Sequence, residues 1–122
     1  MPFAVSDSVS QVLAAALDGV SQRQQVTADN IANVDTPGFR ATSVDFETQL
    51  RAAIDGGAFA EGTPVEIGMT ATPTDTPVGA NGNNVDLRKE TMAAIQSQFQ
   101  YQILTRAVSD RYSLIKTAVT GQ

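Results

Sequence analysis

The chain of 122 residues contains no cysteine, no histidine and no tryptophan. Without cysteine it can form no disulfide framework and carries no thiolate. Without histidine it lacks the commonest general base and the commonest transition-metal ligand. It also has no glycine-rich phosphate loop and no paired-acid catalytic motif. The sequence therefore predicts no catalytic residues, no bound metal, no cofactor and no small-molecule substrate.

Basic residues and long apolar runs are also scarce. The 8 basic residues are outnumbered by 13 acidic ones, and the net charge is −5. Nucleic-acid-binding proteins usually carry a basic surface, so no nucleic-acid partner is expected. No apolar run approaches the roughly 18 residues of a membrane span. The N-terminus has no basic region before an apolar block, so no cleavable secretory signal is expected. Taken alone, these features predict a cytoplasmic protein.

The apolar content is only just sufficient for a folded chain. Leu, Ile, Val and Phe together number 29 of 122 residues, against the roughly 20% below which chains tend to be disordered. A core built from them would be thin. We therefore expect the isolated chain to be poorly folded and to need partners that cover its apolar stripes.

Residues 6–33 predict one long amphipathic helix. Gly19 lies in its interior, where glycine costs about 1 kcal/mol relative to alanine, and so indicates close packing. A long stripe of small and β-branched residues suits packing against a second helix. At 100° per residue the stripe falls within a band of about 100°. Its members are Val5, Val9, Val12, Leu13, Ala16, Val20, Thr27, Ile31 and Val34.

A stop signal follows this helix. Pro37 has no N–H to donate and disfavours helical angles at Thr36. Pro37 and Gly38 suit the central positions of a type II turn, in which the second residue has positive φ. Asn30 and Asn33 share a helix face just before the stop. Their amides have two options, the last open carbonyls of the helix or a neighbouring chain.

The middle of the chain predicts a short helix and an irregular segment. Residues 40–44 should be extended, and Asp45 should be the N-cap of a helix that ends at Gly56-Gly57. The apolar positions of this helix are Phe46, Leu50, Ala53 and Ile54. Six glycines and three prolines fall among residues 55–86. We expect one weak strand at 63–67 and otherwise a mobile loop that lies along neighbouring subunits.

The last predicted helix begins after the N-cap Asp86 and runs from Leu87 to about Thr120. Its apolar residues form two stripes on nearly opposite sides, which predicts two sets of neighbours, although a kinked helix following one core stays open. One stripe holds Met92, Ile95, Phe99 and Ile103. The other holds Tyr101, Leu104, Val108, Tyr112, Ile115 and Val119, and is the one expected to meet the first helix.

Charged pairs in this helix admit a chemical or a structural interpretation. Asp86 and Glu90 are spaced as a metal pair would be. The favoured interpretation is a cap followed by a first-turn acid stabilised by the helix dipole. Arg106, Asp110 and Arg111 are similarly predicted to form a surface or interface ion-pair group.

Two stretches resemble a known family. Residues 28–40, Ala-Asp-Asn-Ile-Ala-Asn-Val-Asp-Thr-Pro-Gly-Phe-Arg, are similar to the N-terminal signature of bacterial flagellar rod, hook and hook-filament junction proteins. Residues 82–90, Gly-Asn-Asn-Val-Asp-Leu-Arg-Lys-Glu, with Gln100-Tyr101-Gln102, match the second signature. The Asp35 to Phe39 ending and Val44-Asp45-Phe46 resemble the proximal rod members most. Asp29 departs from the asparagine that many relatives carry.

The resemblance implies a fold and a role. The fold is mainly α, with long terminal helices, 1–36 and 87–122, paired antiparallel as a coiled-coil-like hairpin around an irregular middle, 37–86. The role is a structural subunit of the flagellar basal body proximal rod that self-assembles through these helices and transmits torque across the periplasm. The alternative is a helical-hairpin adaptor or chaperone of an export system.

The resemblance also implies partners and assembly residues. The partners are other copies of the chain, other flagellar rod proteins, and inner-membrane ring and export-gate components at the rod base. The protein would be exported without a cleaved signal. The assembly residues are Asn30, Ile31, Ala32, Asn33, Thr36, Pro37, Gly38 and Phe39 in the first signature, and Asp86, Phe99, Tyr101, Leu104, Val108 and Ile115 in the last helix.

Overall fold

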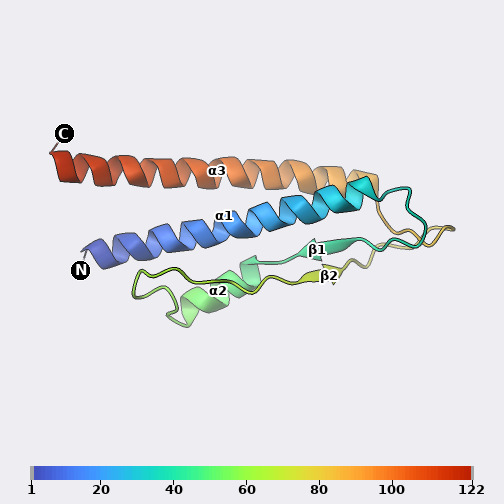
Figure 1. Ribbon diagram of the computed structural model, residues 1–122, viewed down its shortest axis with the longest axis horizontal. Helices are drawn as coiled ribbons and strands as arrows, with labels where there is room; N and C mark the ends of the chain where they lie inside the picture. The colour runs from blue at the N-terminus through green and yellow to red at the C-terminus, as the bar shows by residue number, and fades with distance from the viewer. Residues whose placement is uncertain (1, 122) are drawn as a thin grey trace.

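Two long antiparallel helices dominate the computed structural model, which describes the backbone of residues 2–121 and the side chains of residues 7–121 (Figure 1). Helix α1 spans Pro2–Ala32 and α3 spans Leu87–Thr120. The predicted mainly α fold is confirmed. Helix α1 begins four residues before the predicted Ser6, because proline is tolerated in a first helical turn, where its missing N–H is not needed. The side chain of Val5 lies outside the described residues.

The ends of α3 are set by its local sequence. Asp86 is the N-cap, and its side chain accepts a hydrogen bond of 3.2 Å from the backbone N–H of Lys89. Gly121 closes the helix with a φ of 74° in the left-handed region, where glycine carries no steric penalty. Both the predicted start and the predicted end are therefore confirmed.

A smaller arm packs on the opposite side of α1 from α3 (Figure 1). It consists of β1 (Thr42–Val44), α2 (Glu47–Asp55) and β2 (Ala71–Pro73). The strands are antiparallel, with Thr42 opposite Pro73 and Val44 opposite Ala71.

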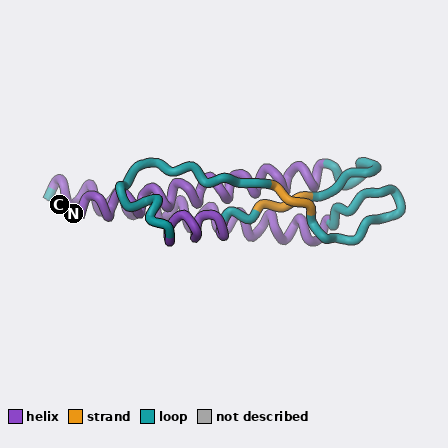
Figure 2. Tube along the Cα trace, turned by 90° about the horizontal axis from the view of Figure 1, so that it is seen from below, coloured by secondary structure: helices purple, strands orange, loops and turns teal. Residues whose placement is uncertain are grey.

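The expected strand at 63–67 is wrong, because the residues that pair with β1 lie further along the chain, at 71–73. Figure 2 shows the loop between α2 and β2 running back beside the helices. Residues 64–67 and Met69 line a groove with the middle of α1, from Gln11 to Gln25. This part of the middle segment thus lies along its own chain, not only along neighbours as the sequence suggested.

Helix α2 begins one residue later than predicted. Its N-cap is Phe46, which makes no side-chain cap bond. Asp45 still performs the capping chemistry, since its carboxylate accepts bonds from the Thr48 N–H at 3.3 Å and the Thr48 hydroxyl at 2.9 Å. These bonds hold the pKa of Asp45 below its usual range. The predicted end at the glycine pair is confirmed, with Gly56 as C-cap and Gly57 at a φ of 78°.

The core lies where α1 meets the arm. Its centre is formed by Ala16, Val20, Val44 and Phe46. A Cβ on Gly19 would lie 2.3 Å from Cγ of Phe46, far inside van der Waals contact. The close packing predicted at Gly19 is therefore confirmed, and the group packed against it is the phenyl ring of Phe46, the N-cap of α2.

Among residues 2–121, no helix is long and apolar enough to cross a membrane.

Candidate assembly site

The two signature stretches meet at the end of the hairpin, where α1 ends and α3 begins (Figure 1). The side-chain amide of Asn83 donates to the backbone carbonyls of Asn33 and Thr36, each at 2.8 Å. The Gly38 N–H donates to the Asn81 carbonyl at 2.9 Å. The turn that leaves α1 is thereby tied to the loop that enters α3. We call this meeting point, residues 30–42 with 81–90, the asparagine junction.

The turn itself has the predicted type II character. The Phe39 N–H donates to the Thr36 carbonyl at 3.2 Å, and Gly38 has a φ of +76°. Gly82 crosses this turn closely, since a Cβ there would lie 3.2 Å from Cα of Gly38. Pro37 and its neighbours Thr36 and Gly38 are exposed. The surface of the junction is therefore a rigid turn accessible to a partner.

Asn84 is the second asparagine that joins separate segments of the junction. It is 5% exposed, and its side-chain oxygen accepts a 2.6 Å bond from the Ala41 N–H. Its amide donates to the Thr76 carbonyl at 3.2 Å, and its backbone N–H donates to the Phe39 carbonyl at 3.3 Å. One buried side chain thus joins the segment before β1 to the segment after β2.

The side chain of Asn30 pairs with the backbone of Thr42 through one donated and one accepted hydrogen bond, as a neighbouring strand would. Its amide donates to the Thr42 carbonyl at 2.7 Å, and its side-chain oxygen accepts from the Thr42 N–H at 3.2 Å. The same amide donates to Glu90 at 3.1 Å, joining the two signatures directly. At 1% exposure Asn30 cannot bond a neighbouring chain. The Asn33 amide donates to the Asp29 carbonyl of its own helix at 2.7 Å, and that carbonyl also accepts the backbone N–H of Asn33 at 3.1 Å.

Glu90 does more than the sequence predicted. It lies in the first turn of α3, as a dipole-stabilised acid should, but it is also 6% exposed and accepts the bond from Asn30. Asp86 and Glu90 are engaged separately, Asp86 with the Lys89 N–H and Glu90 with the Asn30 amide.

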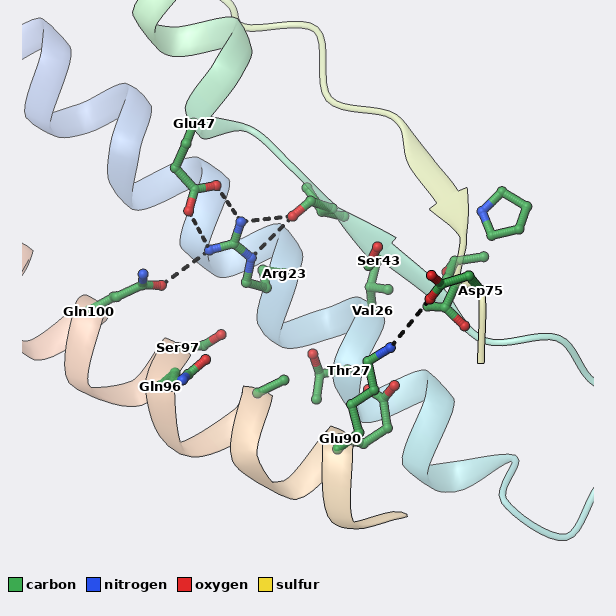
Figure 3. A pocket seen from close by; sticks show the side chains of 16 residues that line it. Arg23, Val26, Thr27, Ser43, Glu47, Asp75, Glu90, Gln96, Ser97 and Gln100 are labelled. Atoms are coloured by element: carbon green, nitrogen blue, oxygen red, sulfur yellow. Dashed lines mark hydrogen bonds and ion pairs between the residues drawn. The ribbon is translucent and has the colours of Figure 1, made fainter. Parts of the chain in front are cut away.

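Arg23 is a further organising residue that the sequence did not single out (Figure 3). Its guanidinium donates to the Val44 carbonyl at 3.1 and 2.8 Å, forms an ion pair with Glu47 and donates to Gln100 of α3 at 3.2 Å. It also lies 4.7 Å above the ring of Phe46. The sequence did hold one signal that could have identified Arg23, because it is the one basic residue before Arg40.

Arg23 and its hydrogen-bond partners line a groove of about 620 Å³ between α1, β1 and α3 (Figure 3). The walls are mixed in charge, with Lys89 lying 4.0 Å from Asp75 on the far side. The groove is therefore a seam between helices and arm, and one arginine ties three elements across it.

The structure separates the two stripes of α3. Leu104 packs against the core cluster, and Val108 and Ile115 line a small apolar cavity with Leu13 and Leu17 of α1. The expected internal stripe is therefore the one that meets α1. Earlier in the helix, the face toward α1 is instead polar and small, as with the fully buried Ser97.

The other stripe points away from α1 and is uncovered. Met92, Ile95, Phe99 and Ile103 are 55%, 47%, 61% and 68% exposed. We call these four side chains the outer stripe. Helix α3 is one unbroken helix over both stripes, and because the outer stripe is exposed, the alternative in which both stripes follow one core is wrong.

The remaining predicted residues have mixed surroundings. Ile31 and Phe39 are partly buried, and Ala32 is exposed. Tyr101, which helix periodicity assigns to the inner stripe, is 42% exposed. The first signature therefore builds the junction, whereas the later residues divide between an inner and an outer helix face.

Comparison with known proteins agrees with this architecture. The sequence model of the family described as "Flagella basal body rod protein" matches residues 11–40, which include the end of α1 and the turn. The chain is 31% identical over 119 residues to the flagellar basal body rod protein FlgB of Bacillus subtilis, covering 91% of this chain and 92% of that protein.

Other bacteria contribute similar relatives. FlgB of Escherichia coli K12 is 35% identical over 112 residues, covering 77% of this chain and 80% of that protein. FlgB of Aeromonas hydrophila is 30% identical over 118 residues, covering 88% and 89%. The similarity extends over both helices and the arm between them. The chain therefore belongs to the FlgB family of flagellar basal body rod proteins.

Proposed function

We propose that the chain builds the proximal rod by packing the outer stripe of α3 against neighbouring subunits, while the asparagine junction keeps each hairpin rigid. As a member of the FlgB family the chain is a structural component of the basal body rod and not an enzyme. Assembly with other rod proteins follows from that membership. The proposal concerns which surface makes the contacts.

The observation that carries the proposal is the exposure of the outer stripe. Four large apolar side chains, 47–68% exposed, follow one another along α3 with no charged residue among positions 91–105. Contiguous apolar surface of this kind marks protein–protein contact sites. The opposite face of the same helix already packs on α1, so this stripe is free for an intersubunit contact.

The junction supports the mechanical part of the proposal. Torque passes between subunits only if each subunit resists bending at the point where its two long helices join. The side chains of Asn83 and Asn84 bond the backbone on both sides of that point, with distances between 2.6 and 3.2 Å. Buried polar networks with every member satisfied are rigid. The first signature then serves assembly by fixing the angle at which the helices leave the turn.

The remaining partners follow from the family resemblance. We place the subunit near the base of the rod, in contact with other copies of itself and with inner-membrane ring and export-gate components. We expect export without a cleaved signal. No nucleic acid and no small-molecule substrate enters this function.

A two-variant experiment tests the proposal. Phe99→Ala removes a side chain that is 61% exposed, whereas Leu104→Ala removes one that packs on the core. Purified Phe99→Ala should keep wild-type helicity by circular dichroism, yet cells that carry it should make few rods and swim poorly. Leu104→Ala should lower helicity and thermal stability before assembly, by up to about 2 kcal/mol for a partly buried leucine.

The comparison depends on both assays being run on both variants. Rods are counted in purified basal bodies, and expression is checked by immunoblot. Normal rods and swimming with Phe99→Ala would contradict the role of the outer stripe. Identical profiles for the two variants would show that α3 has a single functional face.

A further inference from the structure

A second apolar surface lies on the other side of the molecule. The side chains of Val9, Val12 and Leu13 on α1 face Ile54 at the end of α2 and Phe59 after it, around a groove of about 420 Å³. We call this the arm groove. Val9 and Ile54 are 37% and 45% exposed at its edge, while Phe59 is buried at 4% and forms its floor. No described residue of the chain fills it.

The groove and the outer stripe cannot meet within one chain. Helix α1 lies between α3 and α2 (Figure 1). The outer stripe is on the side of α3 away from α1, as its exposure shows, whereas the groove opens between α1 and α2. Each apolar surface therefore requires a partner from another molecule.

The charges around the two surfaces are opposite in sign. The groove segments 7–13 and 54–61 contain Asp7, Asp55 and Glu61 and no basic residue. Arg88 and Arg106 flank the outer stripe, and at 100° per residue both lie on the same side of α3 as its four side chains, with Asp110 one turn beyond Arg106. Both arginines are exposed.

The same asymmetry holds for the whole chain. Residues 87–120 carry five basic side chains and two acidic ones, a net charge of +3 within a chain of net charge −5, so the remainder carries −8. Helix α3 is thus attracted to the α1 and α2 side of another copy.

Pairing of two outer stripes is disfavoured by the same charges. Two copies of α3 placed stripe to stripe would bring the flanking arginines of both copies together, in either helix direction. Like charges brought together at an interface cost free energy. Stripe against groove instead brings the arginines that flank the stripe near the aspartates of the groove segments.

We infer that the outer stripe of one subunit docks in the arm groove of a second copy of this chain. This inference rests on the proposed function and names the surface that receives the stripe. The contact joins two different patches, so each subunit keeps one free stripe and one free groove. Such heterologous contacts extend into open helical assemblies and do not close into a two-fold dimer. That property suits a subunit of a rod.

Cysteine cross-linking tests the inference, since the natural chain has no thiol. A variant with both Ile54→Cys and Ile103→Cys is expressed in place of the wild type under reducing conditions, and its basal bodies are isolated and then oxidised. Both positions are partly exposed, 45% and 68%, so the fold is retained. We expect a ladder of multimers of this chain on a non-reducing gel, which collapses on reduction.

The matched control moves one thiol around the helix. Ile54→Cys with Gln98→Cys places the second thiol at an exposed position off the stripe. It should give roughly tenfold less cross-linked product, because a disulfide needs Cα atoms within about 7 Å. Ile103→Cys alone should give little dimer. Efficient dimer from Ile103→Cys alone would overturn the inference in favour of stripe-to-stripe pairing.

Charge reversal gives an independent measurement in case the double-cysteine variant does not assemble. Arg106→Glu should reduce rod number severalfold, and adding Asp55→Arg should restore it by recreating the ion pair in reverse. Absence of rescue would overturn the inference. If rods form with the cysteine pair but no ladder appears, the inference fails while the proposed function stands. Normal rods with Phe99→Ala would instead remove the proposed function itself.

Discussion

At the scale of single residues, side-chain amides of asparagine replace missing backbone partners. Asn30 donates to and accepts from Thr42, and Asn84 accepts from the N–H of Ala41. Asparagine carries both a donor and an acceptor at the reach of a strand neighbour. Segments too irregular to form a sheet therefore have satisfied backbone groups in the interior. These residues stabilise the fold because their removal would leave buried N–H and carbonyl groups without hydrogen-bond partners.

Asn84→Ala should lower the free energy of unfolding by about 1–3 kcal/mol, the cost of leaving a buried backbone donor unsatisfied. Chemical denaturation followed by circular dichroism measures the change. Asn33→Ala is the matched control, since its bond to Asp29 is exposed and local. An equal loss for both variants would contradict the special role of the buried amide.

Gly19→Ala should destabilise the chain although alanine favours helices. The new Cβ would lie 2.3 Å from the ring of Phe46. Overpacking of this kind costs about 1–3 kcal/mol, which exceeds the gain of about 1 kcal/mol in helix propensity. Gly68→Ala, where a Cβ meets nothing within 4 Å, is the control. The measurement is the melting temperature of each variant, and a higher melting temperature for Gly19→Ala would refute the steric argument.

At the scale of elements, one cation joins the arm to both helices of the hairpin. Arg23 of α1 reaches the carbonyl that ends β1, the first residue of α2 and a glutamine of α3. Glu47 is half exposed, 52%, so its ion pair with Arg23 is screened by solvent and contributes little. The bonds to the Val44 carbonyl are the more important ones, because Val44 is buried at 5%.

Arg23→Gln should loosen the arm while leaving α1 and α3 paired. Glutamine lacks the forked donors that reach two partners at once. We expect faster amide hydrogen exchange in residues 42–55 and unchanged exchange in residues 83–97, which lead into α3 and form its first turns. High salt should reproduce only a small part of the effect, since it screens Glu47 but not the bonds to the carbonyl. Uniformly faster exchange in the whole chain would show that Arg23 supports the entire core instead.

At the scale of the whole molecule, the chain is long, thin and sparsely packed. Its buried apolar residues are few and lie near α1 and the start of α2. The last turns of α3 are uncovered, with Leu114 at 67% and Val119 at 77% exposure. Stability should therefore be uneven along the helices and should increase when neighbouring subunits cover these surfaces.

Hydrogen exchange on dilute protein should show this gradient directly. Amides of α3 in residues 109–120 should exchange at least about tenfold faster than those in residues 83–97, because local opening is cheapest where few apolar contacts hold a helix. The gradient should flatten in assembled rods. A cooperative unfolding transition with uniform protection in a proven monomer would contradict both the gradient and the expected need for partners.

Features controlled by neighbouring residues were predictable from the sequence. The cap at Asp86, the turn at Pro37-Gly38 and the end of α2 at the glycine pair each depend on backbone preferences within a few residues. The two faces of α3 also followed from helix periodicity alone. These features depend on interactions that span no more than a few turns, so the chain order contains them.

Contacts between distant residues could be decided only by the tertiary structure. Asn30 meets Glu90 from 60 residues away, and Arg23 meets Gln100 from 77 residues away. The strand formed at 71–73 because β1 offered a pairing edge there, although residues 63–67 have the stronger intrinsic preference. Such contacts depend on how the arm folds back on α1, and no local pattern encodes that path. The sequence thus determined the helices and their faces, while the fold determined which polar side chains lock them together.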